Sequence, residues 1–168
     1  MQTDVIIIGA GISAKLTALY LSIHRFKVIV FPNQVIKDDT SNLVTFFSSG
    51  SIKFLLEILR DDQSLISYEN IKQLCCCQYD QLDKENFEFN FDNNNEEFLG
   101  KIIPNKKINE LLDQLIHSNE NIHILNDEFV DDIKQQHNQI EVSTKTSTSF
   151  SAKLLIMADG KNSMVKKY

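Results

Sequence analysis

The sequence is poor in cysteine, and its three cysteines are consecutive: Cys75, Cys76 and Cys77. Neighbouring side chains of a strand point to opposite faces, so these residues cannot easily share one disulfide or one tetrahedral metal site. We expect three reduced, half-buried and metal-free strand residues. A chain of 168 residues buries about 70% of the surface that its unfolded form exposes, so a stable core needs neither a disulfide nor a metal.

Long apolar segments and an excess of basic residues are also missing. No run reaches the roughly 20 apolar residues of a membrane-spanning helix. The first apolar run follows Asp4, where a signal peptide would carry positive charge. The net charge of -6 and the pI near 5.2 give no basic surface for nucleic acid or an anionic bilayer. These absences favour an intracellular protein that binds no nucleic acid and has no transmembrane segment.

The opening stretch, "DVIIIGAGISAKLTALYLS" at 4–22, is the first strong signal. It predicts a strand at 4–8 and a helix from about Ile12 to His24, and "KVIVF" predicts a second strand at 27–31, which completes a βαβ unit. Gly9, Gly11 and Ala14 fit the G-x-G-x-x-G/A pattern. In that pattern the first glycine permits a tight turn, the second lets the backbone approach a pyrophosphate, and the third small residue allows close helix–strand packing. The alternative is a tight turn without a ligand.

The acidic residue that should follow this pattern is absent. It is expected about 20 residues after the glycines, at the end of the second strand, where it would bind the adenosine ribose. Pro32 stands at that place and has no side-chain acceptor. Asp38 and Asp39 lie a few residues further on; they are either substitutes for it or solvated loop residues.

The remaining periodicity predicts one α/β domain over residues 1–168, with a β-rich insertion at 71–104. A long loop is expected at 32–51. Helices are expected at 51–59, capped by Ser51 with Ile52, Leu55, Leu56 and Leu59 on one face, and at 105–118, capped by Asn105 with Ile108, Leu111, Leu112 and Leu115 on one face. Strands are expected at 71–79, 86–92, 99–104, 121–125, 129–135, 139–144 and within 152–160, with a turn at 93–95.

The second informative stretch is "AKLLIMADGKNSMVKK" at 152–167. A buried strand that runs into Ala158, Asp159 and Gly160 places a carboxylate at the C-terminal edge of a sheet. Taken alone, Asp-Gly is a common turn. Together with Gly9 and Gly11 it favours a Rossmann-like fold, in which strands 4–8, 27–31 and 153–157 share one parallel sheet and the helix from Ile12 packs on it.

The two end stretches together resemble the FAD-dependent aromatic hydroxylases, the class that includes para-hydroxybenzoate hydroxylase. The chain is most similar to its branch in ubiquinone biosynthesis, the polyprenyl-phenol and methoxyphenol hydroxylases. Three internal segments fit that branch as well: "SSGSIKFLLEIL", "NFDNNNEEFLGKIIPNKKINELL" and "FVDDI". The similarity covers essentially all 168 residues.

The resemblance implies a set of cofactor-binding residues. They are Gly9, Gly11 and Ala14 for the FAD pyrophosphate, Val130 on the strand whose backbone meets adenine, Asn105 on the flavin side, and Ala158, Asp159 and Gly160 in a motif associated with FAD and NADPH. It assigns no catalytic acid or base, because a flavin reduced by NAD(P)H carries the hydroxylation of an aromatic ring. The histidines, His24, His117, His123 and His137, are expected at the surface.

Three departures from the family pattern accompany the resemblance. The ribose-binding Glu falls on Pro32, the flavin-side Arg falls on Leu43, and the Arg after Asp-Gly is represented only by Lys166 or Lys167. The chain is also truncated relative to the family, whose members are more than twice as long and carry a Gly-Asp-Ala motif in the second half.

The leading hypothesis is therefore the N-terminal FAD-binding part of a monooxygenase. Such a protein would be cytoplasmic or peripheral to the inner membrane. It is either a fragment of a longer protein, one half of a split protein that pairs with a chain carrying the C-terminal half, or a stand-alone protein. The alternatives are a non-catalytic remnant with weak or no flavin binding, and a nicotinamide-dependent dehydrogenase, which the β-rich middle and the Asp-Gly motif disfavour.

Overall fold

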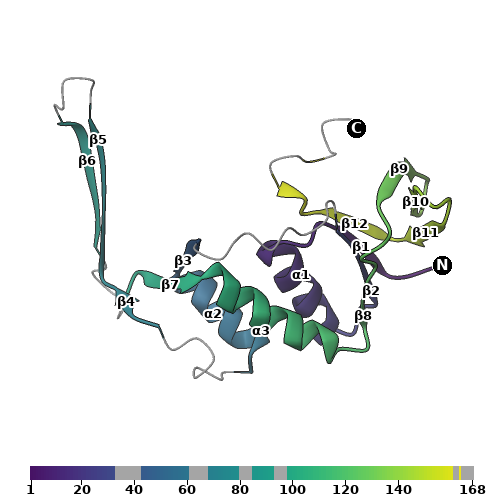
Figure 1. The fold of residues 1–168 in the computed structure, drawn as a ribbon, viewed down its shortest axis with the longest axis horizontal. Helices are drawn as coiled ribbons and strands as arrows, with labels where there is room; N and C mark the ends of the chain where they lie inside the picture. Colours follow the sequence, from purple (N-terminus) through teal and green to yellow (C-terminus); the bar gives the residue numbers. More distant parts are fainter. Residues whose placement is uncertain (33–42, 61–67, 80–84, 93–97, 161–162, 164–168) are drawn as a thin grey trace. The chain divides into compact units, whose positions relative to one another are not determined.

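The computed structural model describes residues 1–32, 43–60, 68–79, 85–92, 98–160 and 163 (Figure 1). The chain divides into two compact units, which are taken one at a time below. The first unit is Met1–Ser41 with Ile108–Tyr168, and the second unit is Asn42–Lys107. Both contain helices and strands, as expected of an α/β fold. The expected turn at 93–95 lies outside the described residues, as do Asp38, Asp39, Lys166 and Lys167.

A parallel sheet forms the centre of the first unit. Its strands are β1 (Val5–Ile8), β2 (Val28–Phe31), β8 (Ile122–Ile124) and β12 (Leu154–Met157), in the order β12-β1-β2-β8. Val5 pairs with Leu154 on one side and with Val28 on the other, in parallel register. Helix α1 (Ile12–Ile23) packs on β1, β2 and β8. The predicted sheet and its helix are therefore confirmed.

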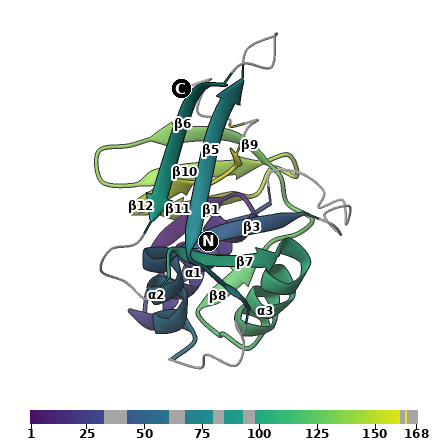
Figure 2. The same cartoon turned by 90° about the vertical axis from the view of Figure 1, so that its left-hand side faces the viewer.

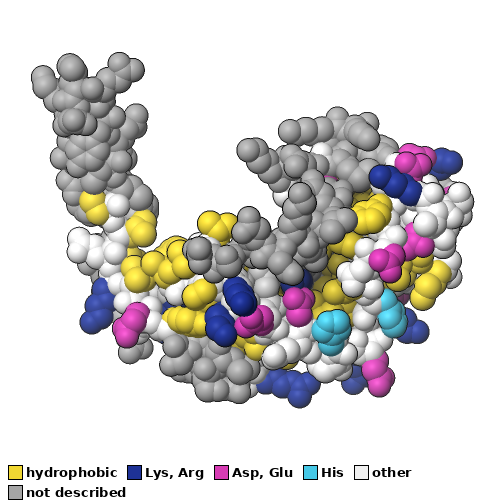
Figure 3. Space-filling model, in the orientation of Figure 1, with side chains coloured by type: hydrophobic (Ala, Val, Ile, Leu, Met, Phe, Trp, Pro, Cys, Tyr) yellow, Lys and Arg dark blue, Asp and Glu magenta, His cyan; other side chains and the backbone are white. Residues whose placement is uncertain are grey.

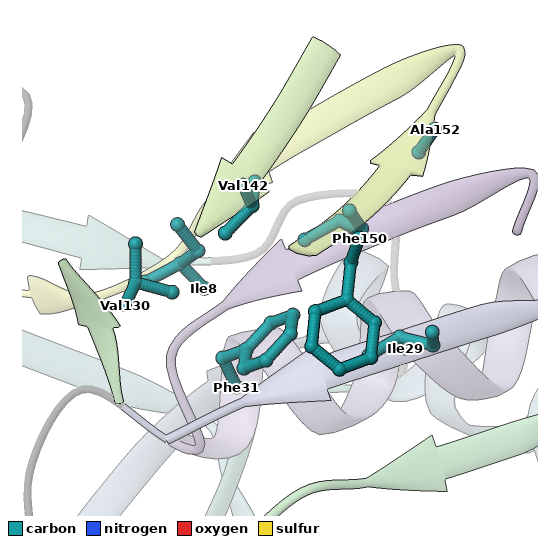
Figure 4. Packing of buried hydrophobic residues seen from close by; sticks show 8 residues of the cluster. Ile8, Ile29, Phe31, Val130, Val142, Phe150 and Ala152 are labelled. Atoms are coloured by element: carbon teal, nitrogen blue, oxygen red, sulfur yellow. The ribbon is translucent and has the colours of Figure 1, made fainter. Parts of the chain in front are cut away.

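The parallel sheet is covered on both faces, which explains why β1 and β2 are apolar at every position. Both strands are fully buried. A second, antiparallel sheet of β9 (Val130–Gln135), β10 (Ile140–Thr144) and β11 (Ser149–Ala152) supplies the residues that cover one face. Figure 4 shows the Phe31 and Phe150 rings meeting edge to face there, with centroids 5.1 Å apart.

The end of the first unit differs from the prediction in one respect. The strand expected within 152–160 is β12, and β11 (Ser149–Ala152) is an additional strand that was not predicted; the chain passes from one sheet to the other at Lys153. The Lys153 N–H donates to the Asp4 carbonyl at 3.2 Å, where the parallel sheet begins. All four histidines are exposed, as predicted.

The second unit is built on a three-stranded antiparallel sheet, β3-β7-β4, of which Figure 2 shows β3 beside β7. Its elements are β3 (Val44–Ser48), α2 (Ser49–Ile58), β4 (Asn70–Ile71), the hairpin β5 (Gln73–Tyr79) and β6 (Glu85–Asp92), β7 (Gly100–Pro104), and the first turn of α3 (Asn105–His117). The prediction of a loop through 32–51 is wrong for residues 44–48, which form β3 against β7.

The β3–β7 pair is apolar on both faces. Phe47 and Ile103 are buried, and α2 packs against both strands with Ile52 and Leu55. Phe46 and Ile102, which are paired across the two strands, are instead 40% and 42% exposed. Figure 3 shows hydrophobic side chains gathered at the surface over these strands. A half-buried strand is usually recognised by alternating polar and apolar residues. β3 lacks that alternation because its apolar residues lie on both faces.

Two further expectations concern the middle of the chain and the membrane. Cys75 lies on β5 and is exposed rather than half-buried; the side chains of Cys76 and Cys77 are outside the described residues.

In the described part of the chain, no helix combines the length and the apolar character needed to cross a bilayer.

Candidate functional site

Gly9 stands where β1 ends, and two independent features require a glycine there. Its φ is +127°, a conformation that strains any residue with a Cβ. A Cβ at this position would also lie 2.1 Å from the Ala158 carbonyl oxygen and 3.0 Å from the Asp159 nitrogen. Gly9, the first glycine of the G-x-G-x-x-G/A pattern, therefore permits both the turn after β1 and the close packing of that turn against Ala158 and Asp159.

Gly11 is the N-cap of α1 and has space around it. Its φ of -75° and ψ of 176° are ordinary extended values, and no side chain caps the helix at this end. A Cβ on Gly11 would meet no described atom within 4 Å. The first turn carries no acidic residue, so the positive end of the helix dipole is not offset by a carboxylate of the helix itself. Ala14 is completely buried, as the packing role of the third small residue predicts.

The structure brings the second motif to the first. The Ala158 N–H donates to the Ile8 carbonyl at 2.7 Å, and the Gly9 N–H donates to the Phe31 carbonyl at 2.7 Å. Asp159 is partly buried, and Gly160 is exposed with a φ of +69°. The ends of β12, β1 and β2 thus meet at one edge of the sheet, with Gly9 at the centre.

This edge is also where the strand order reverses. From β1 the chain continues to β2 on one side, whereas β12 is added on the other side. In open α/β sheets, ligands bind outside the carboxyl ends of the strands at such a switch point. The glycines and the Ala-Asp-Gly turn, which the sequence places at opposite ends of the chain, both lie there.

Val130 and Pro32 belong to the same unit. Val130 begins β9, pairs with Thr144 and is 9% exposed in the core cluster; Figure 4 shows its side chain next to Ile8. Only its backbone is therefore left for an adenine contact. Pro32 is buried directly after β2, at the expected place of the ribose carboxylate, and supplies no side-chain acceptor.

Asn105 lies in the second unit, as the first residue of α3. Its Oδ1 accepts a hydrogen bond from the Thr45 hydroxyl at 2.6 Å, and its N–H donates to the Leu43 carbonyl at 2.8 Å. These contacts fix its side chain against β3. Leu43, at the position of the family's flavin-side Arg, is 59% exposed.

Comparison with solved structures identifies the fold. The chain is similar to p-nitrophenol 4-monooxygenase PnpA from Pseudomonas putida DLL-E4, with 16% identity and a TM-score of 0.70 over 98% of this chain and 43% of that one. It is similar to pqsL of Pseudomonas aeruginosa, described as a probable FAD-dependent monooxygenase, with 16% identity and a TM-score of 0.72 over 99% and 45%. It is also similar to the flavin-dependent monooxygenase PieE, solved with FAD and substrate, with 13% identity and a TM-score of 0.74 over 99% and 32%.

The chain has the fold of the flavin-dependent monooxygenases. It spans less than half the length of each of these three proteins. No protein-family model and no curated protein matches the sequence.

One charged residue beside the glycine turn of this fold was not predicted from the sequence. Lys15, directly after Ala14, is only 6% exposed. Its ammonium group pairs with the Asp113 carboxylate at 2.8 Å and donates to Asn109 Oδ1 at 2.9 Å. Asn109 and Asp113 are one helical turn apart on α3, so Lys15 fastens this part of α3 to the first turn of α1. The available signal was the place of this lysine directly after Ala14, the small residue expected to pack against the sheet.

The described residues contain no group of three or more His, Cys, Asp or Glu side chains that could hold a metal ion.

The pKa of Glu128, just before β9, is lowered by hydrogen bonds from the side chains of Thr144 and Thr146.

Proposed function

We propose that this chain forms the FAD-binding part of a monooxygenase that hydroxylates an aromatic ring. The observation that carries this proposal is the contact of Gly9 with Ala158 and Asp159 at the switch point of the parallel sheet. A tight turn that binds no ligand would account for Gly9. It would not account for Gly11, a second glycine at the N-terminus of α1 whose Cβ position is free of neighbouring atoms. The similarity to flavin-dependent monooxygenases supports the choice of FAD.

The residues present fit the pyrophosphate of FAD. Gly11 leaves room for a phosphate to approach the backbone, and the N-terminus of α1 provides N–H groups and a positive dipole end for it. Gly9 and Ala14 would hold the turn in place, and Ala158, Asp159 and Gly160 would form the neighbouring wall. The ribose end fits poorly because Pro32 offers no carboxylate.

The remaining roles come from the resemblance. The Val130 backbone would meet adenine, and Asn105 would serve the flavin side. FAD, when bound and reduced by NAD(P)H, supplies the oxygen chemistry. The residues of this chain would bind and orient the cofactor and exclude water from it, which is consistent with the absence of an assigned catalytic acid or base.

Within the class, we propose the ubiquinone-biosynthesis branch, with a polyprenyl phenol or methoxyphenol as substrate. The segments 48–59, 90–112 and 129–133 support this assignment by their resemblance to the branch. The location that goes with this proposal is the cytoplasm or the periphery of the inner membrane. A second polypeptide segment would complete the enzyme.

The experiment that tests FAD binding compares two glycine substitutions. A Cβ meets no described atom within 4 Å at either Gly11 or Gly50, so Gly11→Ala and Gly50→Ala should both fold, with stability changes of about 1 kcal/mol or less. A methyl group on Gly11 would occupy the space for the pyrophosphate. Titration followed by flavin fluorescence should show about tenfold or more weaker binding for Gly11→Ala, equal to about 1.4 kcal/mol, and unchanged binding for Gly50→Ala.

Equal affinity of the two variants would remove the glycine turn from the FAD site. No measurable binding by the unmodified chain would instead support the alternative function, a non-catalytic remnant of a hydroxylase. Pro32 is the observation that favours this alternative, since it removes a contact that the complete site would have.

A further inference from the structure

Helix α1 carries two buried polar side chains, and both of them bind to α3 or to the residues just after it. Lys15, near the start of α1, pairs with Asp113 and donates to Asn109. Ser22, near the end of α1, is 5% exposed, and its hydroxyl accepts a hydrogen bond from Asn119 Nδ2 at 2.9 Å. Asn119 lies just beyond the end of α3, so these parts of the two helices run alongside each other in the same direction.

Lys15 links the glycine turn to α3 through two separate groups. Its backbone N–H donates to the Gly11 carbonyl at 3.0 Å, which is the first α-helical hydrogen bond of α1. Its ammonium nitrogen lies 2.8 Å from Asp113 Oδ1 and 2.9 Å from Asn109 Oδ1. The same residue therefore holds Gly11 with its backbone and α3 with its side chain. Ser22 lies in the last turn of α1, away from the glycines.

Stability alone does not explain the choice of a lysine at this buried position. Ala18 and Leu19, which share the face of Lys15 one turn further along α1, are apolar and buried. A buried ion pair contributes little more than apolar residues of similar size would, because each charge loses its hydration. What the pair adds is direction, since an ammonium group held by two oxygen atoms has one favoured position, whereas an apolar contact allows a helix to shift.

The start of α1 is the part of the helix where direction matters most. No side chain caps it, and a Cβ on Gly11 would meet no described atom within 4 Å. Glycine also gives the backbone more conformational freedom than any other residue. The first N–H groups of a helix have no partner within the helix, and in α1 these are the groups that the proposed function assigns to the pyrophosphate.

We propose that Lys15 is a positioning residue: its ion pair with Asp113 fixes the first turn of α1 and thereby aims the N–H groups after Gly11 at the diphosphate of the cofactor. The identity of this ligand rests on the proposed function. The Lys15 side chain is directed at α3, so it acts through the backbone of the turn. Loss of the pair should loosen the turn and weaken FAD binding even where the fold keeps its stability.

The test uses the full 168-residue chain and separates position from stability. The variant is Lys15→Met with Asp113→Ala, which removes both charges and keeps a long apolar side chain at the buried position. The matched control is Ser22→Ala, which removes the polar contact at the other end of α1. Amide hydrogen exchange by NMR compares the protection at position 15, whose N–H bonds to Gly11, with that of Leu19 in the same helix. A change in global stability alters both amides alike and leaves their ratio unchanged.

In the double variant, protection at position 15 should fall about tenfold or more relative to Leu19, because the first turn opens independently of the rest of the helix. The affinity for FAD, measured by flavin fluorescence, should fall about threefold or more, because the turn is no longer preorganised. Ser22→Ala should leave both the protection ratio and the affinity unchanged.

An unchanged protection ratio in the double variant would overturn the proposal. So would an FAD affinity equal to that of the unmodified chain, or equal losses in Ser22→Ala. Failure of the proposed function looks different: the unmodified chain would bind no FAD while the protection at position 15 still depended on the ion pair. The cofactor assignment would then be wrong, and the positioning of the turn by Lys15 would stand.

Discussion

At the scale of single residues, Lys15 shows how a local motif is fastened to the rest of its unit. A buried ammonium group is stable only when it is paired and hydrogen-bonded, and Lys15 has both Asp113 and Asn109. Asp113 remains 43% exposed, so water moderates the pairing. The interaction tethers α3 to the helix that follows the glycines, and removal of either partner should be felt at that turn.

Asp113→Ala should lower the free energy of unfolding by about 1–3 kcal/mol, because it leaves a buried charge with only Asn109 as a partner. Lys15→Met with Asp113→Ala should recover part of that loss, since a methionine fills the space without a charge. Urea unfolding measures both. The control is Lys134→Ala, which removes an exposed pair at 4.0 Å and should cost less than about 0.5 kcal/mol. Similar values for Asp113→Ala and Lys134→Ala would contradict the role given to Lys15.

Glu128 gives a pH-dependent prediction. Hydrogen bonds from Thr144 and Thr146 hold the pKa of Glu128 below its ordinary value. A carboxyl whose pKa is lower in the folded state stabilises the fold above its unfolded pKa, and this contribution is lost as the pH falls through the folded pKa. Thr146→Val should therefore raise the pKa of Glu128 in an NMR titration, and its stability deficit should shrink below the ordinary glutamate pKa. Thr148→Val, which leaves both hydroxyls in place, should not; a Glu128 pKa unaltered by Thr146→Val would refute the assignment.

At the scale of elements, the start of α2 shows how a serine-rich stretch misleads. The pattern "SSGS" predicts Ser51 as the N-cap, but the helix begins at Ser49 and the Ser48 hydroxyl accepts a hydrogen bond from the Ser51 N–H at 3.3 Å. Ser48, Ser49 and Ser51 lie within four positions, and each carries a hydroxyl group that could cap the helix. The pairing of β3 with β7 decides among them, because it keeps Ser48 in an extended conformation, as an N-cap requires.

Ser48→Ala should destabilise the protein by about 0.5–2 kcal/mol, the usual cost of losing an N-cap side chain. Ser51→Ala should cost less, because the donor to the cap is the Ser51 backbone and alanine is the better helix former. The urea concentrations at the unfolding midpoints of the two variants measure this difference. A larger loss of stability in Ser51→Ala than in Ser48→Ala would show that Ser51 is the N-cap, as the sequence predicted.

The elements that sequence predicted well are those whose environment is uniform along the chain. β1 and β2 are buried at every position, and α3 has a regular apolar face with Ile108, Leu112 and Ile116 buried. β3 was missed because its apolar residues lie on both faces, and β11 because it joins β12 through a single residue, Lys153. In the site, the glycines were predictable from spacing, whereas the contact of Gly9 with Ala158 depends on a sheet that joins both ends of the chain.

At the scale of the whole molecule, the proposed cofactor site fits FAD well at its pyrophosphate end and poorly at its ribose end. In the proposed site, the turn of Gly9 and Gly11 would fit a pyrophosphate, and Pro32 would give the ribose no side-chain acceptor. The similar monooxygenases have more than half of their length outside the matched part. Binding energy in such a site is distributed over the whole cofactor, so this chain should bind FAD weakly and purify without colour.

Pro32→Glu should strengthen FAD binding, because it returns a carboxylate to the end of β2 next to the glycine turn. A charged hydrogen bond contributes about 1.5–3 kcal/mol, or roughly ten- to a hundredfold in affinity. Pro32 is buried, so the control is Pro32→Gln, which removes the ring and adds a side chain of the same length without the charge. Fluorescence titration with FAD should rank Pro32→Glu above Pro32→Gln, and Pro32→Gln at or above the unmodified chain. Equal affinities for the Glu and Gln variants would show that the end of β2 does not meet the ribose, and tight binding by the unmodified chain would show that Pro32 leaves no gap in the site.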